Sequence, residues 1–164
     1  MRASAWWSVA VPMLLLTAHP GRTAAQGQPG PQWSAADAAA LRAYALTMDK
    51  LTRTNDASTD LQKLAEAHPE LAASPGSGDA TTLDEMAARL SAPEVRAVLV
   101  KHGLTAKEYV MTFMTAMNAW GAALAEDQGK SATDLPVSAA NVKFYRDHKA
   151  EIEKMNQAAT SGDN

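Results

Sequence analysis

The sequence predicts an all-α domain, an irregular helical bundle of four to six helices around one central buried helix. The longest apolar run beyond the N-terminal segment spans residues 104–126, and its large side chains recur at steps of three and four. Several apolar runs also follow a Ser or Thr that has Glu three positions later, which is a helix-start signature. No stretch shows sustained alternation rich in β-branched residues, so we expect no sheet.

The central helix is expected to begin at a capping box formed by Thr105 and Glu108. Its large apolar side chains form one stripe: Tyr109, Phe113, Met117, Trp120 and Leu124. This stripe is widened by Val110, Met114 and Gly121. The opposite side has small or weakly polar residues: Thr112, Thr115, Asn118 and Ala122. A face this wide packs on more than one neighbour, so we expect a helix that is buried on most sides at the middle of the bundle. The close crossing of a neighbouring helix would explain Gly121.

A membrane span is the alternative for the same run. Its uncharged part covers only residues 109–125, at the short limit of the roughly 17–25 residues that a span needs. It also contains two threonines and an asparagine. These features favour a helix in a protein core.

Residues 1–25 have the composition of a secretory signal peptide. Arg2 gives a basic start, residues 6–18 are apolar, and small residues precede a cleavage point after Ala25. An uncleaved anchor is the alternative, but the apolar run is too short to span a membrane. We expect a protein of the periplasm or a secreted protein, with no transmembrane segment after signal removal.

Charge and cysteine content exclude several function classes. The chain has 164 residues and a formal net charge of -3, and removal of Arg2 and Arg22 with the signal peptide would make it -5. An acidic chain is not expected to bind nucleic acid. With no cysteine, there is no disulfide, no thiolate metal site, no cysteine nucleophile and no lipid anchor at the cleavage site. The partner and the oligomeric state stay open.

After a disordered leader at 26–33, a single helical domain is expected at 34–159, followed by a frayed tail at 160–164. Ser34 and Asp37 open its first helix. The buried side of that helix is expected to include Leu41, Ala45, Met48 and Leu51. Residues 53–60 have poor helix propensity, so the helix either breaks there or bends and continues to His68. Residues 73–79 form the clearest loop.

Two short helices are expected before the central one. Capping boxes at Thr82–Glu85 and Ser91–Glu94 start them, and Gly103 ends the second. Residues 127–135 form a polar loop. A last helix starts at Ser138 and runs to the tail, with one apolar side.

The central helix contains a row of methionines at Met111, Met114 and Met117. Thioether sulfur is a soft ligand that suits copper(I). Methionine is also a common gap-filler in cores, and steps of three drift around a helix. Core packing is the favoured interpretation, so these residues are only weak candidates for a metal site.

No catalytic residues and no cofactor are predicted. The histidines beyond the signal peptide, His68, His102 and His148, are isolated from one another, and a metal site needs several convergent ligands. The sequence contains no recognisable nucleophile with a plausible base. The aromatic residues of the central helix offer one candidate site, an apolar pocket between helices lined by Tyr109, Phe113 and Trp120. The alternative is that they are ordinary core residues.

Three segments resemble a family of small exported helical proteins of environmental Gram-negative bacteria, whose function is unknown. They are LTMDK at 46–50, KHGLTAKEY at 101–109, and ANVKF at 140–144 followed by His148 and Lys149. The resemblance covers about residues 46–155 and implies no catalytic residues. Ala106 stands where that group has proline. A weaker resemblance, to periplasmic helical chaperones with an LTxxQ motif, departs at Glu108.

These features together predict an exported, non-enzymatic helical protein that binds a ligand or a partner. Two alternatives stay open. One is a periplasmic chaperone-like or stress protein, and the other is a binder of a soft metal such as copper or of a small apolar ligand.

Overall fold

The computed structural model describes residues 33–71 and 82–161. These residues form seven α-helices and one short 3₁₀-helix, with no strand among them. The all-α prediction is therefore confirmed. The predicted signal peptide, the leader up to residue 32, the loop at 73–79 and residues 162–164 lie outside the described part.

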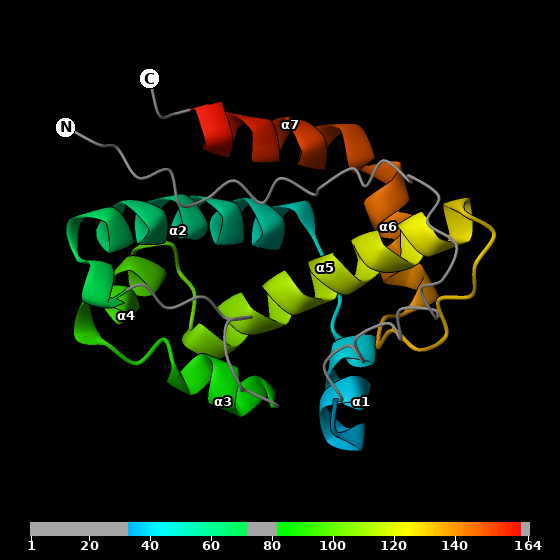
Figure 1. Cartoon of the computed structure of the whole chain (residues 1–164), viewed down its shortest axis with the longest axis horizontal. Helices are drawn as coiled ribbons and strands as arrows, with labels where there is room; N and C mark the ends of the chain where they lie inside the picture. Colours follow the sequence, from blue (N-terminus) through cyan, green and yellow to red (C-terminus); the bar gives the residue numbers. More distant parts are fainter. Residues whose placement is uncertain (1–32, 72–81, 162–164) are drawn as a thin grey trace, which may run out of the picture. The chain divides into compact units, whose positions relative to one another are not determined.

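The helices surround α5, as the sequence predicted. In chain order they are α1 (Ala35–Ala43), α2 (Met48–Ala67), the 3₁₀-helix η1 (Pro69–Leu71), α3 (Leu83–Ala88), α4 (Pro93–Lys101), α5 (Ala106–Asp127), α6 (Ala139–Asp147) and α7 (Lys149–Ser161). Helices α1, α2, α3, α4 and α6 all pack on α5, whereas α7 packs on α2 (Figure 1). The α-helices number more than four to six because the predicted first and last helices are each broken.

Most predicted helix ends are formed by local hydrogen bonds. Both bonds of the capping box are present at Thr82–Glu85 and at Thr105–Glu108. Gly103 ends α4 with φ of 66°, and the Leu104 amide donates to the Leu99 carbonyl at 2.9 Å. The predicted box at Ser91–Glu94 is wrong. Helix α4 begins at Pro93, and the residue before it makes no side-chain cap.

The predicted first helix breaks at residues 44–47, not at 53–60. Asn141 on α6 holds this segment in an extended form. Its Oδ1 accepts from the Leu46 amide at 3.0 Å, and its Nδ2 donates to the Tyr44 carbonyl at 2.6 Å. Thr47 then caps α2 by accepting from the Lys50 amide at 3.2 Å. The backbone groups that a continuous helix would satisfy are thus paired elsewhere.

Residues 53–60 are helical throughout despite their poor propensity. Thr54 and Ala57 are buried in the bundle. The Ser58 and Thr59 hydroxyls donate to carbonyls one turn back, at 2.8 and 3.1 Å. Tertiary packing therefore decides the conformation here, as it often does against weak propensity.

The predicted last helix is two helices, with the break at His148. The His148 ring lies against Phe144, with ring centroids 4.7 Å apart. Helix α7 extends to Ser161, beyond the predicted start of the tail at residue 160. At the other end of the domain, Trp33 packs against the core instead of belonging to the leader.

The core has two clusters along α5. The first joins its N-terminal half to α1, α2, α3 and α4, and the second joins its C-terminal half to α2, α6 and α7. In the second cluster the buried residues of α5 are small ones: Ala119, Ala122 and Ala123. No helix in the described residues has both the length and the apolar character needed to cross a membrane.

The prediction that α5 is buried on most sides is confirmed in its first half, but it is wrong for the large apolar side chains of its second half. Tyr109 and Val110 are buried, but Met117, Trp120 and Leu124 are 45%, 44% and 43% exposed. Small side chains allow α6 to approach α5 closely, so the small face is the buried one. Gly121 faces the loop before α6 rather than a crossing helix: a Cβ there would lie 3.4 Å from Leu135 Cδ1.

Two buried threonines of α5 give a matched test of its polar core. Thr112 and Thr115 are both fully buried, but only Thr112 Oγ1 has a partner, the Tyr44 hydroxyl at 2.8 Å. We expect Thr112→Val to lower the free energy of unfolding by about 1–2 kcal/mol, because it leaves the Tyr44 hydroxyl without this hydrogen-bond partner. Thr115→Val is expected to raise it by about 1 kcal/mol, because it removes an unsatisfied buried hydroxyl. Urea denaturation measures both, and equal changes in the two variants would contradict this account.

Candidate functional site

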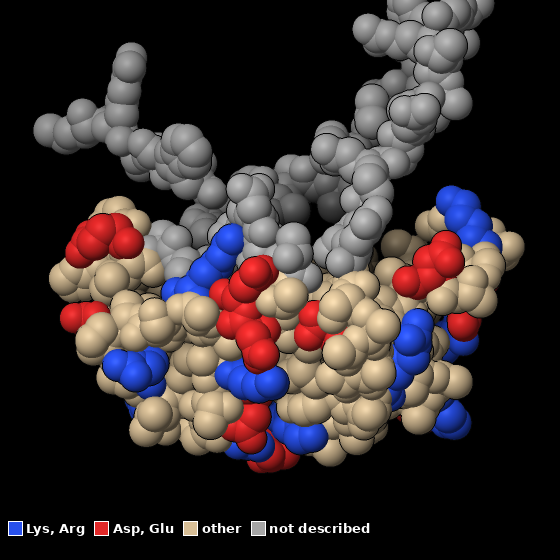
Figure 2. Space-filling model, turned by 90° about the horizontal axis from the view of Figure 1, so that it is seen from below, with Lys and Arg blue, Asp and Glu red and all other residues tan. Residues whose placement is uncertain are grey.

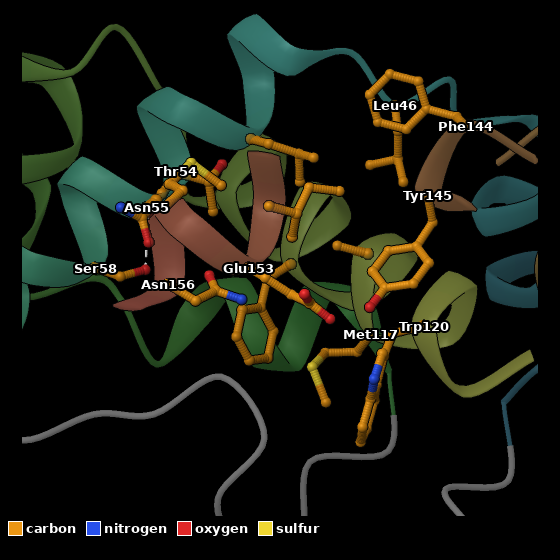
Figure 3. Close-up of a pocket in the computed structure, with 15 residues that line it drawn as sticks. Leu46, Thr54, Asn55, Ser58, Met117, Trp120, Phe144, Tyr145, Glu153 and Asn156 are labelled. Carbon is orange, nitrogen blue, oxygen red and sulfur yellow. Dashed lines mark hydrogen bonds between the residues drawn. The ribbon is translucent and has the colours of Figure 1, made fainter. Parts of the chain in front are cut away.

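A pocket of about 570 Å³ lies between α2, α5, α6 and α7 (Figure 3). Four aromatic side chains line it: Phe113 and Trp120 from α5, and Phe144 and Tyr145 from α6. Thioethers and aliphatic side chains supply most of the remaining apolar lining: Leu46, Leu51, Met117, Ile152 and Met155. A volume of this size and an apolar lining are typical of small-molecule sites.

The breaks in the chain create this pocket. The break at His148 lets α7 turn back onto α2, while α6 stays packed on α5. Helix α7 therefore covers α2 without closing on α5 (Figure 1). The segment held by Asn141 places Leu46 in the same lining. Met117 and Trp120 on α5 are left nearly half exposed at this gap.

One wall of the pocket is polar. Thr54, Asn55 and Ser58 come from α2, and Asn156 comes from α7 (Figure 3). Thr54 is 5% exposed, and its hydroxyl has no hydrogen-bond partner among the described residues. The Ser58 hydroxyl is already engaged, with the Thr54 carbonyl and the Tyr109 hydroxyl each at 2.8 Å. The pocket thus has hydroxyl- and amide-bearing residues on one side and mainly apolar side chains on the others.

Glu153 is the only charged residue among the described residues that line the pocket. Figure 3 shows it among Asn156, Tyr145 and Met117. Its closest cation is Lys149, with Nζ 3.9 Å from Oε1, and both side chains of this pair are more than half exposed. Burial, then the nearby carboxylates of Glu153 and Asp127, raise the pKa of the Tyr145 phenol. Tyr145 is accordingly a neutral lining group at neutral pH.

Of the three aromatic residues predicted to line a pocket, the structure places Phe113 and Trp120 in the lining. Tyr109 lies behind them in the core, 4% exposed, with its ring stacked on Phe113 at 6.4 Å. Burial raises the pKa of the Tyr109 phenol, an effect that its hydrogen bond to Ser58 partly offsets. Tyr109 therefore supports the pocket wall without contacting its interior.

The methionine row faces two different environments. Met111 and Met114 are buried in the first core cluster, 8% and 9% exposed. Met117 is 45% exposed and lines the pocket instead. The structure gives Met111 and Met114 the role of core packing that the sequence favoured.

The predicted histidines lie in three separate places. His68 contacts Glu70 at 3.3 Å, and His148 contacts Glu151 at 3.1 Å. His102 contacts Asp60 at 2.9 Å. Each histidine directly follows the last residue of a helix and is its C-cap residue. A position at a helix C-terminus was the expected one for His68 and His102.

The contact between His102 and Asp60 is the shortest of these three histidine–carboxylate contacts. Lys101 Nζ also reaches Asp60, at 2.7 Å, and the hydrogen bonds from Lys101 and then from His102 lower the pKa of the Asp60 carboxyl group. These residues join α2 to the end of α4 and lie outside the pocket lining. Among the described residues, no group of three or more His, Asp or Glu side chains is arranged to hold a metal ion.

Charges elsewhere on the surface are mixed. On the face shown in Figure 2, acidic and basic side chains are interspersed. Lys107 pairs with Asp84 at 2.9 Å, and Arg146 pairs with Glu126 at 2.8 Å. Such exposed pairs contribute little to stability. The pocket is therefore the more distinctive feature of the described residues.

Sequence reasoning did not identify the polar wall or Glu153. A helical wheel of the last segment places Glu153 among charged residues that look solvent-facing. Only the break at His148 turns this part of α7 toward the pocket. An aromatic pair, Phe144–Tyr145, just before that break was the available signal.

Comparison with protein-family models, with curated proteins and with solved structures found no match.

Proposed function

We propose that the protein is an exported, non-enzymatic helical binding protein that takes a small amphipathic ligand in the pocket between α5 and α7. The observation on which this rests is the pocket itself: about 570 Å³, lined by four aromatic side chains and one polar wall. Bundles commonly place ligand sites between helices, with a few polar groups that orient the ligand. Export is supported by the predicted signal peptide at residues 1–25.

The absence of an enzymatic role is part of this proposal. The titratable lining groups are Glu153 and Tyr145, and the Ser58 hydroxyl in the lining is bonded to a carbonyl and a phenol. None of these is paired as a nucleophile and its base. The arrangement favours retention of a ligand over its chemical conversion.

The test is a titration with N-phenyl-1-naphthylamine, a neutral fluorescent probe of apolar sites. We expect saturable binding to the full-length chain, and we expect Ala116→Phe, which fills the pocket from the α5 wall, to weaken it at least about tenfold. Ala150→Phe makes the same change on exposed α7 surface outside the lining and should leave binding unchanged. Equal binding by both variants would refute the pocket as the site.

One further observation favours a chaperone-like role as second candidate. Met117, Trp120 and Leu124 form an exposed apolar stripe on α5, which begins in the pocket lining and continues beyond it. Exposed apolar surface of this kind can hold apolar segments of other proteins. Under this alternative, Leu124→Ser, which lies outside the pocket lining, weakens suppression of client aggregation but not binding of the naphthylamine probe.

A further inference from the structure

We propose that the ligand of this pocket is an organic cation, an apolar or aromatic body with an ammonium or similar positive group. This inference rests on the proposed function and specifies the chemistry of its ligand. It follows from the charge of the lining, from the nature of its aromatic groups and from the shortage of metal-type ligands.

The charge of the lining is negative. Glu153 is the single charged member among the described lining residues, so an anionic ligand would meet a like charge and no cation within the pocket. Lys149 would compete with a ligand cation for Glu153, since its Nζ lies 3.9 Å from Glu153 Oε1. This ion pair is long and exposed, and it is therefore weak. A ligand cation that is partly shielded from water can therefore replace Lys149.

The charged groups counted next to the pocket also include more carboxylates than cations. Arg146 is held by two carboxylates, Glu126 at 2.8 Å and Asp127 at 3.0 Å. Together with Lys149 and Glu153, these groups amount to two cations and three carboxylates. These five groups thus have a net charge of -1, and both Glu153 and Asp127 raise the pKa of Tyr145.

The aromatic groups suit a cation as well. The face of an aromatic ring attracts positive charge, and indole does so most strongly. Phe113 and Trp120 line the pocket from α5, while Phe144 and Tyr145 line it from α6, so its aromatic groups come from two helices. A carboxylate beside several rings is a general means of binding ammonium groups without a metal-like coordination shell.

The same lining does not suit a metal cation. A metal ion needs several convergent oxygen, nitrogen or sulfur ligands, whereas this lining has one carboxylate, and its two thioethers, Met117 and Met155, come from different helices. Its other polar groups are hydroxyls and amides spread over α2, α6 and α7.

The experiment uses three probes of similar size on the full-length chain: benzyltrimethylammonium, its neutral carbon isostere neopentylbenzene, and the anion 3-phenylpropionate. Affinities are measured by NMR titration at low and at high salt. We expect the cation to bind more tightly than the anion, and we expect this preference to shrink at high salt because the charges at the pocket are partly exposed.

Two variants identify the source of the preference. Glu153→Gln is expected to weaken the cation about fivefold while changing the affinity for the neutral isostere by less than about twofold. Glu151→Gln removes the same charge from the same helix outside the pocket lining, and should change neither affinity by more than about twofold. Trp120→Leu should weaken the cation roughly threefold more than it weakens the isostere.

The outcomes separate this inference from the proposed function. If the isostere binds but Glu153→Gln affects all probes equally, or if the anion binds best, the ligand is not a cation and the pocket remains a binding site. If none of these probes binds but the naphthylamine probe binds and Ala116→Phe weakens its binding, only the cation inference fails. If the naphthylamine titration fails as well, the proposed function fails and the inference fails with it.

Discussion

Replacing Asn141 by alanine is expected to lower the free energy of unfolding by about 3 kcal/mol. Asn141 is 3% exposed, and its amide satisfies the Leu46 N–H at 3.0 Å and the Tyr44 carbonyl at 2.6 Å. Both backbone groups lie where the chain leaves α1 and approaches α2, and neither is paired within a helix. Loss of the amide leaves a donor and an acceptor without partners, each at a cost of about 1–3 kcal/mol.

Asn118→Ala provides the matched control. Asn118 is also an asparagine in a helix, 8% exposed, but its Nδ2 has no hydrogen-bond partner among the described residues. Its replacement is expected to cost less than about 1 kcal/mol. Urea denaturation followed by circular dichroism measures both values. Similar losses in the two variants would show that burial of the asparagine side chain, and not its two hydrogen bonds, is what matters.

The Asn141→Ala replacement is also expected to affect the pocket. Leu46 lines the pocket, and its position depends on the amide bond to Asn141. We therefore attribute one edge of the candidate site to a hydrogen bond between residues 95 positions apart in the chain. Stability of the 44–47 segment and shape of the pocket are linked through this one side chain.

Local signals in the sequence were sufficient for several helix ends. The capping boxes at Thr82 and Thr105 involve residues three positions apart, and the Gly103 turn needs only a positive φ. Such signals are readable because cause and effect lie within one turn of chain. The central position of α5 was also readable, from the length and apolarity of its segment.

Distant contacts decided what the sequence could not show. The break at 44–47 depends on Asn141, and the continuity of 53–60 depends on burial of Thr54 and Ala57. Local propensity indicated a helix through 44–47 and left the continuity of 53–60 open, because it contains no information about the partner helix. The candidate site followed the same rule: the spacing on α5 identified Phe113 and Trp120, whereas Glu153 entered the lining through the arrangement of α7.

The buried face of α5 gives the second large expected effect. Ala122 is 1% exposed in the second core cluster, with α6 packed on the same helix. We expect Ala122→Leu to lower the free energy of unfolding by about 2–3 kcal/mol, because extra methylenes in a close-packed interface force neighbouring side chains and backbone apart. Thermal and urea denaturation of the variant measure this loss.

Leu124→Ala is the control, and the two variants together decide how α5 is oriented. Leu124 is 43% exposed, so its truncation is expected to cost less than about 1 kcal/mol. The hydrophobic stripe in the sequence would instead make Leu124 a buried residue. Truncation of a buried leucine lowers the free energy of unfolding by about 2–5 kcal/mol. Because Trp120 lies on the same stripe and lines the pocket, a large loss at Leu124 with a tolerated Ala122→Leu would bury that stripe and remove the pocket with it. The measured order of the two variants therefore tests the helix packing and the candidate site at once.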